Sequence, residues 1–277
     1  MCKICRRLNS QRQSVNTLVR LIYRAGALDK IILMNLLAFD TSTELMSIAV
    51  QRGGGESVAT VWQHTAPGGA QTSAHLIPAI QGLMAQANLK FEQLQAIVFG
   101  CGPGSFTGLR TACSVAQGLA FGADVPVLPI PTLLTLAEEA RYQHAPHLAP
   151  WQVWALLDAR MDEMYAACYE FDGSKWNEIV GGSLIRPEDL DGGVSAALAG
   201  NVFAVYGSRL PASPGGIHQP RAMDRLEALP TAAALLRLAP SLLAAGGALP
   251  ADQALPLYIR DKVAKTTLER AVGKVAL

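Results

Sequence analysis

Short apolar runs separated by turn-forming residues open the ordered-looking part of this chain. They occupy residues 36–39, 45–50 and 58–63. Between the second and third run, glycines at 53–55 supply the positive-φ residues that a tight reversal requires. The pattern therefore predicts an antiparallel meander of three strands.

A helical period follows the meander. Apolar residues recur three and four positions apart over 73–87. A short buried strand is then expected at 96–99, a glycine-rich loop at 100–108, a helix dense in small residues at 109–121 and a strand at 125–130. The order βββαβαβ predicts a mixed sheet with crossover helices.

The second half opens in the same way. A strand at 153–157 ends at Asp158, a partner strand covers 164–171, and a third is expected at 183–186 before an α/β pattern that reaches a helix from about residue 231. Each half thus begins with a meander whose first strand ends in Asp, which indicates a duplicated unit. We predict an α/β protein of two lobes, each a mixed sheet with flanking helices.

The boundary between the lobes is expected near the prolines at 146 and 150. The predicted parts are a basic extension at 1–33, a first lobe at 34–145 and a second lobe at 146–277. The end of the chain is expected to pack back on the first lobe.

Charge separates the extension from the rest. The formal net charge is +1, but residues 1–33 hold seven Lys or Arg and one acid, which leaves 16 basic and 21 acidic residues, about −5, for the remainder. A mildly acidic body argues against a broad electrostatic grip on nucleic acid, so tRNA would be contacted only indirectly. The extension is predicted to be a start-site artefact or to lack structure, with a basic amphipathic helix as the alternative.

Cysteine use and hydropathy bear on the compartment. Five scattered cysteines are too few for a disulfide framework, which favours the cytoplasm. The Ala- and Leu-rich stretch 229–251 contains Arg237, two prolines and two glycines, so a buried amphipathic helix is expected there and no membrane span.

Two segments could hold phosphate. Asp40, Thr41 and Ser42 follow a buried strand, where a carboxylate can act through a metal or water and hydroxyls can meet phosphate oxygens. The alternative is that these residues only cap the strand and shape a turn.

The second segment is the glycine-rich loop that leads into a helix. Its small residues would let backbone amides approach an anion at the helix N-terminus. The candidates are Gly102, Gly104, Ser105, Thr107 and Gly108. The spacing matches neither a Walker loop nor a dinucleotide-binding motif. A strained connection that packs two lobes or two subunits is the alternative.

Several motifs together resemble the TsaB (YeaZ) family, a non-catalytic relative of TsaD. They are the start Met34–Asp40 with Thr-Ser-Thr-Glu, the stretch Gly-Pro-Gly-Ser-Phe-Thr-Gly-Leu-Arg at 102–110, Leu-Asp-Ala-Arg-Met-Asp-Glu-Met-Tyr at 157–165 and Pro-Leu-Tyr-Ile-Arg at 256–260. The resemblance runs from Met34 to about Arg260. It implies a two-lobed actin-like, sugar-kinase-like fold.

The resemblance also implies a role in making N6-threonylcarbamoyladenosine beside the tRNA anticodon. A TsaD-type protein performs the transfer, TsaC-type enzymes make the threonylcarbamoyl-adenylate and a TsaE-type protein supplies an ATPase. This chain would be a scaffold that pairs with TsaD, and with itself in the absence of TsaD. No cofactor would be required, with ATP or ADP at the complex interface as a candidate ligand and the phosphate-like site a relic.

The pairing surface implied by the resemblance uses the helices at 73–87 and 109–121. The candidate interface residues are His75, Leu76, Ile80, Leu83, Met84, Arg110, Ala112 and Ala116. Small residues would permit close helix approach, and the alternative is that they pack against the lobe's own sheet.

Catalysis is not expected. TsaD-like enzymes hold a metal with a His-x-x-x-His pair, and residues 129–137 of this chain contain no histidine. An ATP-dependent phosphotransferase remains the main alternative, in which Asp158 and Arg160 would supply a base and a cation. A peptidase would need a base beside Ser105, and the sequence contains neither a His-Glu-x-x-His helix nor a Gly-x-Ser-x-Gly elbow.

Overall fold

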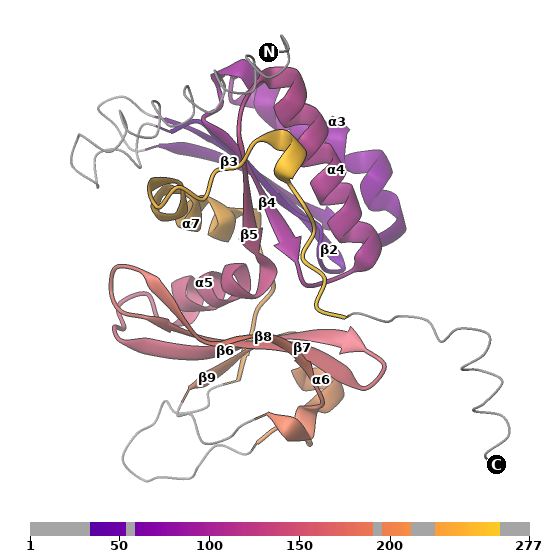
Figure 1. The fold of residues 1–277 in the computed structure, drawn as a ribbon, viewed down its shortest axis with the longest axis vertical. Helices are drawn as coiled ribbons and strands as arrows, with labels where there is room; N and C mark the ends of the chain where they lie inside the picture. Colours follow the sequence, from indigo (N-terminus) through magenta and orange to yellow (C-terminus); the bar gives the residue numbers. More distant parts are fainter. Residues whose placement is uncertain (1–33, 54–58, 191–195, 212–224, 261–277) are drawn as a thin grey trace, which may run out of the picture.

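A computed structural model describes residues 34–53, 59–190, 196–211 and 225–260. Within these ranges the chain forms two five-stranded mixed sheets with helices between and beside them (Figure 1). The predicted extension at 1–33 lies outside the described residues, as does most of the glycine turn at 53–55.

The first sheet is built as the meander predicts. Its order is β3-β2-β1-β4-β5, with β1 antiparallel to β2 and parallel to β4. The strands are β1 (Leu36–Asp40), β2 (Leu45–Arg52), β3 (Thr60–Pro67), β4 (Ala96–Gly102) and β5 (Val127–Pro131).

The second sheet repeats this topology. Its order is β10-β9-β6-β7-β8, with β6 antiparallel to β7 and parallel to β9. The strands are β6 (Trp151–Arg160), β7 (Glu163–Phe171), β8 (Trp176–Ile185), β9 (Ala197–Gly200) and β10 (Arg225–Glu227). Strand β8 is longer than the expected 183–186, because the turn at Asp172 starts a hairpin that pairs with most of β7.

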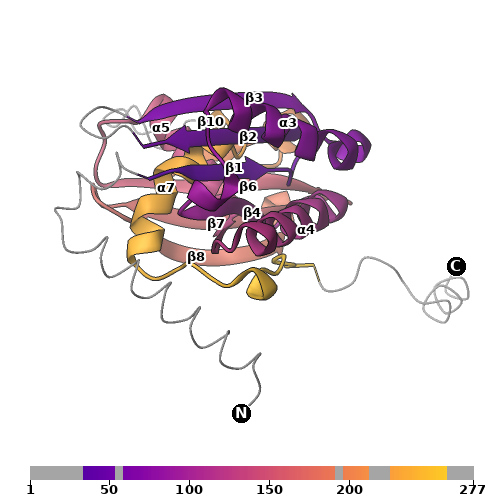
Figure 2. The ribbon, with the colours of Figure 1, turned by 90° about the horizontal axis from the view of Figure 1, so that it is seen from above.

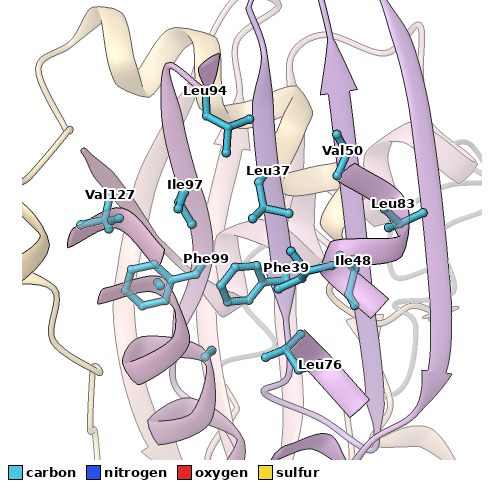
Figure 3. Close-up of a cluster of buried hydrophobic side chains, with 14 of the residues drawn as sticks. Leu37, Phe39, Ile48, Val50, Leu76, Leu83, Leu94, Ile97, Phe99 and Val127 are labelled. Atoms are coloured by element: carbon cyan, nitrogen blue, oxygen red, sulfur yellow. The ribbon is translucent and has the colours of Figure 1, made fainter. Parts of the chain in front are cut away.

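Two helices cover one face of the first sheet. They are α3 (Thr72–Gln86) and α4 (Phe106–Ala123). Leu37 and Phe39 of β1 point towards them, together with Ile97 and Phe99 of β4 (Figure 3). The intervening residues of the same strands pack on the opposite face, so both strands are buried on both sides.

The opposite face is covered by α7 (Ala232–Ala244), which follows the second sheet in the chain. The backbone N–H of Ala232 donates to the buried Ser47 Oγ of β2 at 2.9 Å, and Thr231 caps the helix by accepting from Ala234 N. The end of the second half therefore completes the core of the first sheet.

A helix from the first half likewise packs on the second sheet. Helix α5 (Thr132–His144) follows β5 of the first sheet, and its apolar side chains pack with β6 and β7 of the second sheet. Helices α5 and α7 lie between the two sheets and contact each other (Figures 1 and 2). The lobe boundary at residues 145/146 stays a prediction. In the packing, each half of the chain contributes a helix to the core of the other half, α7 to the first sheet and α5 to the second.

Short helical turns complete the described chain. They are η1 (Gly69–Gln71), η2 (Phe91–Gln93), η3 (Pro187–Asp189), α6 (Phe203–Tyr206) and η4 (Ala251–Gln253). Among the described residues, no helix combines the length and the apolar character that crossing a membrane would need.

Candidate functional site

The turn after β1 is a closed hydrogen-bonded unit. Asp40, Thr41 and Ser42 are all buried. Asp40 Oδ1 accepts hydrogen bonds from the backbone N–H of Ser42 at 2.8 Å and from Ser42 Oγ at 2.6 Å. The amide and hydroxyl that could meet a phosphate oxygen are thus engaged by the carboxylate of their own turn.

The second carboxylate oxygen of Asp40 is enclosed. Within the described part of the chain, Asp40 Oδ2 is buried without a hydrogen-bond partner. A Cβ atom at position 100 would lie 1.8 Å from it, so any residue other than glycine there would have to displace the Asp40 carboxylate. Burial in this environment disfavours the charged form and raises the pKa of Asp40 to about 6.

The glycine-rich loop packs directly on this turn. Ser105 N donates to the Ser42 carbonyl at 2.7 Å, and Thr41 Oγ1 donates to the Gly108 carbonyl at 2.8 Å. Cβ atoms at Gly104 and Gly108 would lie 2.5 Å and 1.9 Å from the carbonyl oxygens of Ser42 and Thr41. These two glycines therefore serve close backbone packing between the segments that were singled out as phosphate candidates.

The other two loop candidates point elsewhere. Gly102 has φ of +122°, and its N–H donates to Thr132 Oγ1 at the start of α5. Thr107 lies exposed in the first turn of α4, where its carbonyl accepts from Thr111. The structure thus gathers Asp40, Thr41 and Ser42 with the loop, and leaves Thr107 on the surface.

The loop is also covered by a segment that sequence reasoning did not assign to it. Leu257 N donates to the Cys101 carbonyl at 2.7 Å. A Cβ at Gly102 would lie 2.4 Å from the Leu257 carbonyl oxygen. The sequence predicts that the end of the chain packs back on the first lobe, but nothing local in residues 256–260 indicates which loop, 150 residues earlier, they contact.

The residues considered for other chemistries have local roles. Asp158 accepts from Arg160 Nη1 at 2.9 Å and from Tyr206 Oη at 3.0 Å, which makes the carboxylate and the cation an ion pair. Ser105 Oγ accepts from Gly108 N and caps α4. Over the described ranges, no group of three or more His, Cys, Asp or Glu side chains could hold a metal ion.

Most of the predicted interface residues are inside the first lobe. Side chains on the inner faces of α3 and α4 form the core against the sheet. The buried residues are Leu76, Ile80, Leu83, Met84, Ala112 and Ala116. Only His75 and Arg110 are exposed. The use of these helices for pairing stays a prediction, and it now concerns their other faces.

Those other faces define an outer helical surface. It consists of Ala74, His75, Ile77, Pro78, Gln81, Gly82 and Ala85 of α3 with Arg110, Ser114, Gly118, Phe121 and Gly122 of α4. Phe121 is 84% exposed. Within the part of the chain that the structure describes, a Cβ atom at Gly82, Gly118 or Gly122 would meet nothing within 4 Å. Each glycine costs helix stability, about 1 kcal/mol relative to alanine, and no contact among the described residues explains that cost.

Comparison with known proteins gives consistent relatives. The family model described as "TsaD: tRNA N6-adenosine threonylcarbamoyltransferase" matches residues 63–267. The tRNA threonylcarbamoyladenosine biosynthesis protein TsaB of Escherichia coli is 31% identical over 234 residues, which cover 83% of this chain and 96% of that protein. The TsaB protein of Haemophilus influenzae is 37% identical over 164 residues, 56% of this chain and 65% of its own length.

Solved structures agree. The structure of YeaZ from Pseudomonas aeruginosa has a TM-score of 0.69 and 33% identity, and the match covers 81% of this chain and 99% of that one. A second solved structure, described as an uncharacterized protein with similarity to peptidase YeaZ from Pseudomonas aeruginosa, has a TM-score of 0.70 and 34% identity, and the match covers 82% of this chain and 100% of that one. The predicted two-lobed actin-like fold with a mixed sheet in each lobe is confirmed.

Proposed function

Because the chain belongs to the TsaB (YeaZ) family, we propose that it is an accessory subunit in the formation of N6-threonylcarbamoyladenosine in tRNA. The relative from Escherichia coli, whose name refers to tRNA threonylcarbamoyladenosine biosynthesis, is matched over 96% of its length. The subunit would support a TsaD-type transferase and would not perform the transfer itself.

The outer helical surface is the site that we propose for the transferase. Its glycines leave open space along two neighbouring helices, and close approach of backbones is what small residues on a helix face permit. Phe121 lies among them as an exposed aromatic side chain, the residue type that anchors many protein interfaces. In the absence of the transferase, a second copy of this chain would use the same surface.

The absence of catalysis in this subunit is supported by the closed site. The hydroxyls of Thr41 and Ser42 and the amides of Ser42 and Ser105 all donate to atoms of the protein. A phosphate would have to displace these buried hydrogen bonds. We therefore propose that the subunit needs no cofactor, that ATP or ADP binds only at the complex interface, and that a TsaE-type ATPase and tRNA are met through the complex.

The role is tested by reconstitution. Purified TsaC-, TsaD- and TsaE-type proteins are combined with tRNA and substrates, with this protein added or omitted, and modified adenosine is quantified by mass spectrometry. We expect product only when the protein is present, and product within about twofold of the parent with Asp40→Asn. Equal product after omission would refute the accessory role, and loss of product with Asp40→Asn would restore the alternative of a working phosphate site.

The surface is tested by a matched pair of variants. Gly118→Leu should weaken binding of the TsaD-type protein at least tenfold, roughly 1.4 kcal/mol, because the leucine side chain would fill the open space that the glycine leaves on the outer helical surface. Ala244→Leu adds a similar side chain at an exposed position of α7 and should leave binding unchanged. Binding is measured by isothermal titration calorimetry. Unchanged binding with Gly118→Leu would place the contact elsewhere.

A further inference from the structure

The segment that follows η4 crosses from one lobe to the other. On the first lobe, the Ala254 carbonyl accepts from Gln117 Nε2 at 2.8 Å and from Cys113 Sγ at 3.4 Å. The Leu257 N–H donates to the Cys101 carbonyl, as described above. These contacts attach the segment to α4 and to the end of β4.

An exposed cluster strengthens this first attachment. The Tyr258 ring packs against Phe106 with ring centroids 5.2 Å apart, and Arg110 Nε donates to Tyr258 Oη at 3.1 Å. The Arg110 guanidinium also lies over the Phe106 ring at 3.7 Å. Phe106 and Arg110, near the start of α4, thus hold Tyr258 in the middle of the segment.

The last two described residues attach to the second lobe. Ile259 packs against the core formed by α5 and the second sheet. Arg260 pairs with Glu163 at the start of β7 and donates to the Arg160 carbonyl. Its side chain is only 12% exposed. Figure 1 shows the segment, in yellow, descending from the first lobe to the second-lobe sheet.

Glycines receive the segment on both lobes. A Cβ at Gly102 of the first lobe would collide with the Leu257 carbonyl, and a Cβ at Gly182 of β8 would lie 3.1 Å from Ile259 Cδ1. The next glycine on the same strand, Gly181, would bring its Cβ only within 3.4 Å of a flexible Glu178 side chain. Gly102 of the first lobe and Gly182 of the second lobe therefore leave room for Leu257 and Ile259 of the segment.

A separate connection joins the lobes through α5 and α7. Arg237 of α7 donates to both Glu138 and Glu139 of α5, and Trp176 Nε1 of β8 also donates to Glu138. Proteins built from two lobes commonly engage ligands by hinge closure about one connection. Among the described residues, segment 254–260 therefore joins the lobes in addition to the connection through α5 and α7.

We infer that residues 254–260 form an interlobe clasp that holds the two lobes at a fixed distance from each other. The clasp gives the protein a fixed shape, in contrast to the hinge closure of two-lobed kinases. The inference does not depend on the proposed role in tRNA modification, because it concerns the motion of this chain alone.

Two substitutions on one strand provide the test. Gly182→Val forces a branched side chain against Ile259, and Gly181→Val makes the same change one residue earlier, away from the clasp. The first readout is hydrogen exchange of the Leu257 amide, which donates a hydrogen bond to Cys101 of the first lobe, whereas both substitutions lie in the second lobe. We expect exchange roughly tenfold faster or more with Gly182→Val and unchanged exchange with Gly181→Val.

The second readout is the distance between the lobes. Spin labels on ketone-bearing residues introduced at the exposed positions Gln86 and Lys175 report the interlobe distance distribution in the full chain. We expect this distribution to broaden or shift with Gly182→Val only. If Leu257 exchanges faster while the distance distribution stays as narrow as in the parent, the segment contacts both lobes without restricting their relative motion, and the inference is wrong.

A second variant guards against local distortion of β8. Arg260→Ala removes the ion pair at the far end of the clasp, and Arg209→Ala removes two ion pairs, with Asp162 and Glu188, that lie wholly within the second lobe. Arg260→Ala should accelerate Leu257 exchange and broaden the distance distribution, and Arg209→Ala should do neither. If neither Gly182→Val nor Arg260→Ala changes the two readouts, the clasp is refuted.

Discussion

The carboxyl group of Asp40 has one oxygen satisfied within its own turn and the other enclosed against Gly100. Its neighbours hold the glycine-rich loop in place through buried hydrogen bonds. Both readings of these residues from sequence, a phosphate site or a structural turn, involve the same atoms. Structural contacts engage the hydroxyls of Thr41 and Ser42 and the amides of Ser42 and Ser105, which is why we propose that the segments are a relic of a phosphate site.

Asp40 should make stability depend on pH. Its pKa is raised to about 6 in the folded protein from 3.8, so the stability that it contributes is fully present below pH 3.8 and is lost as pH rises through about 6. The loss is at most about 3 kcal/mol. Asp40→Asn cannot titrate, so its free energy of unfolding relative to the parent should rise between pH 4 and 7, as measured by urea denaturation.

Asp172 provides the control of opposite sign. Hydrogen bonds from the backbone N–H groups of Lys175 and Ser174 lower its pKa, so its contribution is present above its unfolded pKa and is lost as pH falls. Asp172→Asn should therefore change the pH dependence only on the acid side of pH 4. If the curves of Asp40→Asn and the parent run parallel from pH 4 to 7, the carboxyl of Asp40 is not buried as described.

At the scale of elements, α4 carries two kinds of glycine on one helix. Gly108 faces the Thr41 carbonyl, and Gly118 faces open space. The helical period in the sequence locates the helix correctly, but period alone does not say which small residues face the sheet. Ala112 and Ala116 proved to face it, and Ser114 and Gly118 face away.

Alanine substitutions should separate the two kinds. Gly118→Ala should stabilise the isolated protein by about 0.5–1 kcal/mol, because alanine restricts the unfolded chain and meets no obstacle in the helix. Gly108→Ala should destabilise it, because its Cβ would lie 1.9 Å from a carbonyl oxygen. Chemical denaturation of dilute protein measures both. A destabilising Gly118→Ala would mean that this glycine serves the chain's own fold.

At the scale of the whole molecule, the two halves are joined by charge as well as by packing. Glu138 and Glu139 are buried between α5 and α7, and both accept hydrogen bonds from Arg237. Arg141 makes a further ion pair with Glu138. Buried carboxylates are costly unless paired, so this network ties the position of α7 to that of α5.

Removing the shared cation should be severe. Arg237→Met keeps much of the side-chain volume but leaves both carboxylates short of a partner, and we expect a loss of about 3 kcal/mol in the free energy of unfolding. Arg160→Met is the control, because the Arg160 side chain is 79% exposed and its ion pair with Asp158 should contribute less than about 1 kcal/mol. Similar losses in thermal and urea unfolding of the two variants would contradict the role of the network.

Local patterns in the sequence were sufficient to predict the strand meanders and the duplicated topology. They also located the turn at residues 40–42 and the glycine-rich loop at 100–108. Each of these depends on residues close together in the chain, such as the apolar run that ends at Asp40. The same holds for the family motifs, which are contiguous. Strand β8 was the exception, because its exposed residues give a weak apolar signal and it forms by pairing with β7.

Only the tertiary structure decided which faces of α3 and α4 are exposed, that α5 and α7 exchange between the sheets, and that residues 254–260 join the lobes. These features rest on contacts between residues far apart in the chain, such as Leu257 with Cys101 and Ala232 with Ser47. An amphipathic period gives each helix an apolar side but does not name the sheet that will cover it. That choice is made when the whole chain buries its apolar surface at once.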